Sequence, residues 1–160
     1  DPYQYSIYSH AYSQSVAEVQ YAFYLEQVQL AEAIGVDLLR YLKKNFMSRT
    51  SILGPEYMGD DCIVPFEEQF PMAYGTGPFS IQDRYITEDV PVGCHIYHQL
   101  GKKYGVATPV IDSMITLGSV MTGQSFFETG LTLEDLDLAH LSAEETLAYL
   151  EKRQFRKAES

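Results

Sequence analysis

Arg84 stands out among the residues that could carry chemistry, because it is the only Lys or Arg between residues 50 and 101. A lone guanidinium in an acidic stretch is either the ion-pair partner of a neighbouring acid or a receptor for a carboxylate, whose two oxygens its planar fork matches. The residues alone leave both alternatives open. The acids of this stretch are Glu56, Asp60, Asp61, Glu67, Glu68, Asp83, Glu88 and Asp89.

Asp89 is the second candidate for chemistry. Together with Glu88 it precedes Pro91 in the sequence DRYITEDVP, which we interpret as a polar loop that leads into a helix. Acids at such a place stabilise the helix N-terminus. A carboxylate fixed there can also orient a histidine and stabilise its imidazolium form, a common arrangement for acid-base chemistry at neutral pH.

The four histidines give weaker indications. His95 and His98 are three residues apart on an expected helix, a spacing that can bind metal, but no third ligand stands near them in the sequence, and we predict no metal site. His10 lies in a segment rich in Tyr and Ser, and His140 lies in a loop near the end. Both of these are typical of surface residues.

Known catalytic and nucleotide-binding motifs are missing. Gly75-Thr76-Gly77 lacks the later glycine of GxGxxG, follows no credible strand and opens no βαβ unit, so it is not a phosphate loop. The sequence also contains no GxSxG, no HExxH and no Walker lysine. By motif alone, it holds no complete active site and no cofactor-binding residues.

Composition narrows the class of protein. The 160 residues suit one folded domain, and a formal charge of −11 argues against a nucleic-acid binder or a binder of anionic membranes. No apolar run approaches the roughly 18 residues that span a bilayer. The start, DPYQYSIYSH, is no signal peptide, and it reads as a cut from a longer chain. Cys62 and Cys94 form no CxxC pair, so we expect buried thiols and a cytoplasmic protein.

Helical periodicity dominates the sequence, and no segment alternates as a strand does. Residues 13–34 predict one long helix that ends at Gly35, and its apolar stripe is interrupted by Glu26 and Gln27, which indicates a face on a cleft or partner. We expect a second helix at 37–47, then short helical pieces around 62–70 and an irregular connection to about 82.

The second half of the sequence predicts further helices. One follows Pro91 and ends at Gly105, and the next begins at Thr108-Pro109 and runs to about residue 121. Later start signals are a cap-like Thr132 before a short helical turn and a capping box formed by Ser142 and Glu145. The predicted fold class is therefore all-α, with six or seven helices.

Three segments carry a resemblance to a known family. RYITEDVPVG, LGKKYGVATPVIDSMI and GLTLEDLDL closely resemble the C-terminal helical domain of the octopine/nopaline (opine) dehydrogenase family. SQSVAEVQYAFYLEQVQLAEAIGV is similar to the first helix of that domain. The resemblance covers roughly residues 3–155, and its portion from 84 to 112 is the specific part.

The resemblance implies an oxidoreductase that uses NAD or NADP to join an amino acid reductively to a 2-oxo acid. It implies a helical substrate domain, similar to that of 6-phosphogluconate dehydrogenase, behind an N-terminal Rossmann domain that binds the cofactor. Arg84 matches the arginine that grips a substrate carboxylate, and Asp89 matches the acid that partners the catalytic histidine. That histidine lies in a His-Pro context, which this sequence lacks, so the role is not carried over to His10.

The expected organisation is a single helical substrate-binding domain over residues 1–160, with a Tyr-rich lead-in at 1–12 and a basic tail at 151–160. On this interpretation the Rossmann domain is absent and the fragment is inactive alone. Exposed apolar residues on the first helix predict a domain interface and are compatible with a homodimer. The alternative interpretation is a binding or dimerisation module that has the same fold without catalysis.

Overall fold

The computed structural model describes residues 14–38 and 78–158, and every regular element in these ranges is helical. No strand occurs in the described ranges, so the all-α prediction is confirmed. The elements are α1 (Gln14–Ile34), α4 (Arg84–Thr87), the π-helix η5 (Asp89–Cys94), α5 (His95–Tyr104), α6 (Pro109–Thr122), α7 (Phe126–Thr129) and α8 (Ala143–Ala158). The pieces expected around 62–70 lie outside these ranges, as do His10, Cys62 and most of 37–47. Residues 36–38 are not helical.

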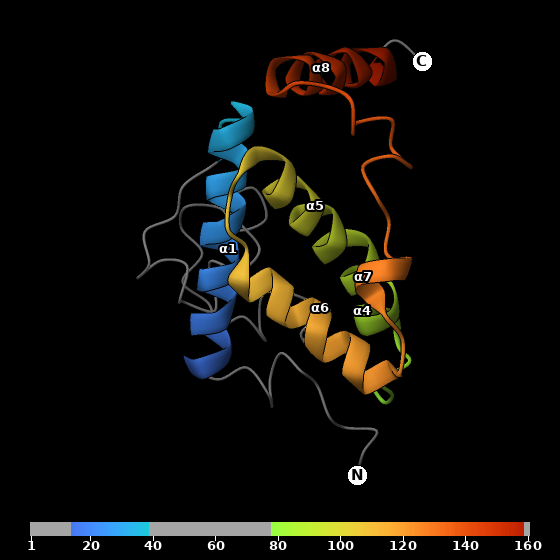
Figure 1. Cartoon of the computed structure of the whole chain (residues 1–160). Coiled ribbons are helices and arrows are strands. Elements are labelled where there is room, and N and C mark those ends of the chain that lie inside the picture. Colours follow the sequence, from blue (N-terminus) through green and yellow to red (C-terminus); the bar gives the residue numbers. More distant parts are fainter. Residues whose placement is uncertain (1–13, 39–77, 159–160) are drawn as a thin grey trace.

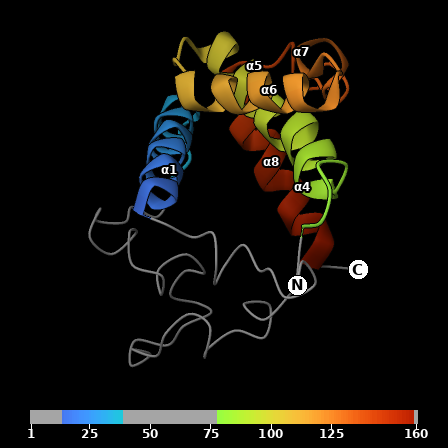
Figure 2. The same ribbon diagram turned by 90° about the horizontal axis from the view of Figure 1, so that it is seen from below.

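The helices form an arch (Figures 1 and 2). Helices α5 and α6 lie side by side, and α1 packs against both of them. Helix α8 lies across the C-terminal end of α1. In the view of Figure 2, α5 and α6 form the top of the arch, while α1 descends on one side and α4 and α8 on the other.

The core joins residues from four elements. Ile111 and Ile115 are one turn apart on α6 and fully buried, and they meet Leu30 of α1, Val90 of η5 and Phe126 of α7. Burial of each of these side chains stabilises the fold by roughly 1.5–3 kcal/mol. The core therefore ties η5 to α1 and α6.

Helix α6 presents only some of its apolar residues to the core. Leu117 and Val120 face solvent, with exposed fractions of 57% and 76%. They belong to the opposite side of the helix from Ile111 and Ile115, which take the core positions.

The N-terminus of α6 is capped from α1. Pro109 occupies the first turn as predicted, but Thr108 makes no side-chain cap bond and its hydroxyl donates to Asp112 instead. The backbone N–H groups of Val110 and Ile111 donate to the two carboxylate oxygens of Glu26, at 2.7 and 3.0 Å. A buried carboxylate thus satisfies groups that a local cap would otherwise serve, and the helix dipole favours its charge.

The segment around Arg84 is helical, which corrects the predicted polar loop. Arg84 opens the single turn of α4, and η5 follows with Pro91 inside it. Proline cannot donate a backbone hydrogen bond, so a regular α-helix loses one bond there. The wider turn brings the N–H of His95 to the carbonyl of Val90, and the freed carbonyl of Pro91 accepts from Leu131.

Helix ends follow the predicted signals elsewhere. Gly35 and Gly105 adopt left-handed φ angles of 90° and 71°, where a glycine avoids the Cβ clash. Ser142 and Glu145 exchange side-chain-to-backbone hydrogen bonds in a capping box before α8. Thr132 makes the same exchange with Asp135, but the residues after it form turns and no helix.

Candidate functional site

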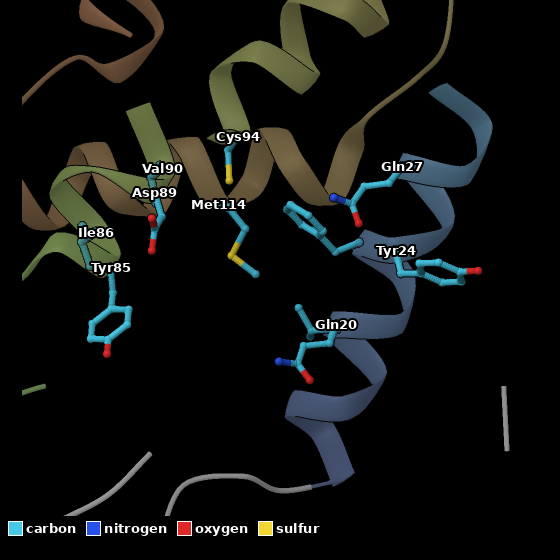
Figure 3. A pocket seen from close by; sticks show the side chains of 11 residues that line it. Gln20, Tyr24, Gln27, Tyr85, Ile86, Asp89, Val90, Cys94 and Met114 are labelled. Carbon is cyan, nitrogen blue, oxygen red and sulfur yellow. The ribbon is translucent and has the colours of Figure 1, made fainter. Parts of the chain in front are cut away.

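A cavity of about 440 Å³ opens between α1 on one side and α4 and η5 on the other. Figure 3 shows the side chains that reach it, with Met114 extending from α6 between the two sides. Its size falls within the range of about 300–1,000 Å³ that is usual for small-molecule sites. The lining residues are Val19, Gln20, Phe23, Tyr24, Gln27, Tyr85, Ile86, Asp89, Val90, Cys94 and Met114.

The described lining is mainly apolar, and its polar groups are few. Asp89 is the only Asp or Glu among these residues, and none of them is Lys, Arg or His. Gln20 and Gln27 project from one face of α1 toward the cavity (Figure 3). Part of α1 thus faces a cavity, as the interrupted apolar stripe predicts; Gln27 lies on that face, whereas Glu26 is buried against the start of α6.

Arg84, the first residue of α4, lies beside Asp89, but it is not among the described residues that line the cavity. Its Nη2 is 3.9 Å from Oδ1 of Asp89, and its Nε is 3.7 Å from Oε2 of Glu88. Its side chain is 67% exposed, and ion pairs this exposed contribute at most about 1 kcal/mol. Arg84 therefore has acidic partners, as one alternative predicted, but these pairs are weak enough for another carboxylate to replace them.

Cys94 supplies a thiol to the cavity wall. Burial raises its pKa to about 11, and the negative charge of Asp89 acts in the same direction. The side chain is a free cysteine. At neutral pH it is a protonated thiol and contributes apolar surface, because the thiolate is the nucleophilic form.

The histidines of α5 serve packing contacts away from this cavity. His95 is buried, and its Nδ1 donates to the carbonyl of Leu131 at 2.8 Å. The ring fits against Gly130 so closely that a Cβ there would approach its Cγ to 2.5 Å. His98 stacks on His95 with ring centroids 5.8 Å apart. Neither ring lines the cavity.

His98 forms a pair that the sequence did not reveal. Its Nδ1 lies 2.7 Å from Oδ1 of Asp112, which also accepts from the hydroxyl of Thr108 at 3.0 Å. The two residues are 14 positions apart on different helices, so no motif spacing could have joined them. They border a second cavity of about 320 Å³ with Lys102 and Pro109.

Other expectations for the site can be placed in the structure. His140 is exposed in a turn, as predicted. Within 14–38 and 78–158, no three of His, Cys, Asp and Glu gather as a metal-binding group. None of the described helices combines the length and the apolar character that crossing a bilayer requires. The histidine expected beside Asp89 is not among the described residues that line the cavity.

Fold and site together define an all-α domain with a mainly apolar cavity, and the one acid among its described lining residues, Asp89, has Arg84 beside it. Residues 1–122 match the family model described as NAD/NADP octopine/nopaline dehydrogenase, alpha-helical domain, and the chain belongs to this family. A 67-residue segment is 39% identical to an opine dehydrogenase from Arthrobacter sp. (strain 1C). That match covers 42% of this chain and 19% of the relative, so the chain spans about a fifth of the relative's length.

Proposed function

We propose that this chain is the substrate-binding half of an opine dehydrogenase-like oxidoreductase, which reductively condenses an amino acid with a 2-oxo acid such as pyruvate. The observation that carries the proposal is that Arg84 lies beside Asp89, the one acid among the described lining residues of the cavity, within a chain of this family. The proposal includes a preceding Rossmann domain, a helical domain similar to that of 6-phosphogluconate dehydrogenase, and a cytoplasmic enzyme. The 160 residues alone are inactive on this proposal.

Arg84 binds a carboxylate of the substrate. Both substrates carry a carboxylate, and a guanidinium can hold one through two parallel hydrogen bonds. The exposed pairs with Glu88 and Asp89 keep Arg84 near the cavity at little cost. A bound substrate then replaces these partners on the side of the guanidinium that meets it.

Asp89 positions the histidine that carries the proton. Its carboxylate belongs to the first turn of η5 and reaches the cavity, where a histidine from outside the described residues would donate to it. Such a pair fixes the imidazole tautomer and stabilises the imidazolium form. Asp89 is therefore a positioning residue, since it acts through the histidine.

The proposed reaction requires no residue of this chain to change its oxidation state. The amine attacks the oxo carbon and water leaves, which gives an imine. When bound, NADH or NADPH supplies the hydride that reduces the imine carbon, and the nitrogen takes a proton to become a secondary amine. At the start of α6, the backbone N–H groups that could bind the cofactor's pyrophosphate already donate to the buried carboxylate of Glu26, so this helix end does not fit it.

Kinetics of the full-length protein test this proposal. Arg84→Ala should raise KM for pyruvate and lower kcat/KM by roughly 10- to 100-fold, because a charge-assisted hydrogen bond is lost, and Arg84→Lys should restore part of it. Asp89→Asn should lower kcat and shift the pH dependence of kcat to lower pH, because the imidazolium loses its counter-charge.

Lys102→Ala is the matched control, since it removes an exposed cation of α5 that lies away from Arg84. It should leave both constants within about twofold. If Arg84→Ala and Asp89→Asn behave like this control, neither residue serves the reaction. A full-length protein that oxidises no NADH with pyruvate and any amino acid would instead favour the non-catalytic module.

A further inference from the structure

The described lining of the cavity between Asp89 and α1 is mainly apolar. Phe23, Ile86, Val90 and Met114 contribute carbon and sulfur surface from four elements. The raised pKa of Cys94 keeps that thiol neutral, so it belongs to the same apolar surface. A group that enters this space loses its water and gains mainly dispersion contacts.

Among the described lining residues, a charged side chain of a substrate meets one acid and no cation. The only acid among the described lining residues is Asp89, which the proposed function already assigns to the histidine. A carboxylate would meet that acid with repulsion and would find no cation on the described lining. Burial of an unpaired charge is strongly unfavourable, whereas transfer of an apolar side chain from water into an apolar cavity is favourable.

We propose that this cavity selects an amino acid with an apolar side chain, and that Met114 is its main specificity-determining residue. The inference rests on the proposed function and adds the substrate class to it. Gln20 and Gln27 lie two turns apart on α1 and offer amide groups to the polar end of the substrate. The apolar side chain points toward α6.

The position and the chemistry of Met114 both suit a specificity-determining residue. It lies on α6 one turn after Val110, and its side chain extends into the middle of the cavity between Asp89 and α1 (Figure 3). Methionine is unbranched and polarizable, so it adapts to side chains of different shape. A charge placed at its tip would stand where the side chain of the substrate ends.

Substitution of Met114 tests the selection in the full-length protein. With NADH and pyruvate, the unchanged enzyme should use L-leucine at least about tenfold better than L-arginine or L-glutamate, measured as kcat/KM, since even one methylene in an apolar pocket changes this ratio about tenfold. Met114→Glu should lower kcat/KM for L-leucine about tenfold and raise it for L-arginine. Met114→Leu keeps the volume and should retain the preference within about threefold.

Leu117→Glu is the matched control, because it adds the same charge to the same helix at an exposed site away from the cavity. It should leave the preference unchanged. A preference of the unchanged enzyme for L-arginine or L-glutamate would overturn the inference. So would equal effects of Met114→Glu and Leu117→Glu.

A second measurement separates this inference from the proposed function. In the 160-residue chain labelled with ¹³C-methyl methionine, the Met114 signal should move when L-leucine is added and stay fixed with L-arginine. Movement with L-leucine, together with no NADH oxidation by the full-length protein for any amino acid, would refute the proposed reaction and keep the apolar selection. Equal movement with both amino acids would refute the selection alone.

Discussion

The thiol of Cys94 experiences two effects that act in one direction. Burial disfavours its thiolate, and the carboxylate of Asp89 repels the same negative charge, so its pKa rises from 9.0 to about 11. A raised pKa of an acid means that the folded protein holds this proton more tightly than the unfolded chain does. The stability that follows is fully present below about pH 9 and is lost as pH rises toward about 11.

Alkylation of this cysteine should therefore be slow at neutral pH. At pH 8 roughly one thiol in a thousand is ionised, and the rate with iodoacetamide should increase tenfold per pH unit up to about pH 11. Asp89→Asn should lower the midpoint, because it removes the repelling charge and leaves the burial. Mass mapping of the alkylated peptides separates Cys94 from Cys62. A midpoint near 9, unchanged by Asp89→Asn, would contradict this account.

Single residues differ in how far the sequence reveals their surroundings. In the sequence, Arg84 is visible as one cation in an acidic stretch and Asp89 as an acid before an expected helix start, and the structure brings the two side chains within 3.9 Å. Their roles in substrate binding and proton transfer stay predictions. Met114 gave no such signal, since a methionine among apolar residues of a helix is equally typical of a core, and only the fold shows that it borders a cavity.

At the scale of elements, local signals predicted helix ends better than helix contacts. Gly35, Gly105 and the Ser142–Glu145 capping box act within a few residues, so the sequence contains all that determines them. The break at Pro91 was predicted as a helix start, yet the chain widens into a π-helix there and stays helical on both sides. Tertiary contacts, such as the one from Leu131 to the Pro91 carbonyl, support that geometry and leave no local pattern.

The contact between α1 and the start of α6 is a long-range cap of this kind, and substitution of Glu26 tests how much it stabilises the fold. Glu26 accepts from Val110 and Ile111 across 84 and 85 positions of sequence and is only 6% exposed. Glu26→Gln keeps the shape but offers one acceptor oxygen, and its NH₂ group meets an N–H donor. The free energy of unfolding should fall by about 2 kcal/mol in urea titrations, which is the usual loss for a buried hydrogen bond to a charged group.

Glu151→Gln makes the same chemical change at an exposed site of α8 and should alter stability by less than about 0.5 kcal/mol. The two variants share the loss of one negative charge, so their difference measures the cap itself. If both unfold at the same urea concentration as the parent chain, Glu26 does not hold α6 in place.

At the scale of the whole molecule, the net charge of −11 contrasts with the proposed anionic substrates. The overall field of this chain opposes their approach, so attraction must be local. Arg84 lies beside Asp89 of the cavity lining, and in the sequence it is the only Lys or Arg between residues 50 and 101. Affinity for a carboxylate should then depend on one side chain rather than on the charge of the domain.

Substrate and dinucleotide bind to different domains in the proposed enzyme. On the proposed function, the described helices bind substrate and leave the dinucleotide to a preceding domain, since Glu26 occupies the N–H groups at the start of α6. NADH should therefore show no binding to the 160-residue chain up to about 1 mM, measured by its fluorescence and by calorimetry, which corresponds to less than about 4 kcal/mol. The full-length protein should bind NADH in the micromolar range. Micromolar binding by the chain alone would show that it contains a dinucleotide site of its own.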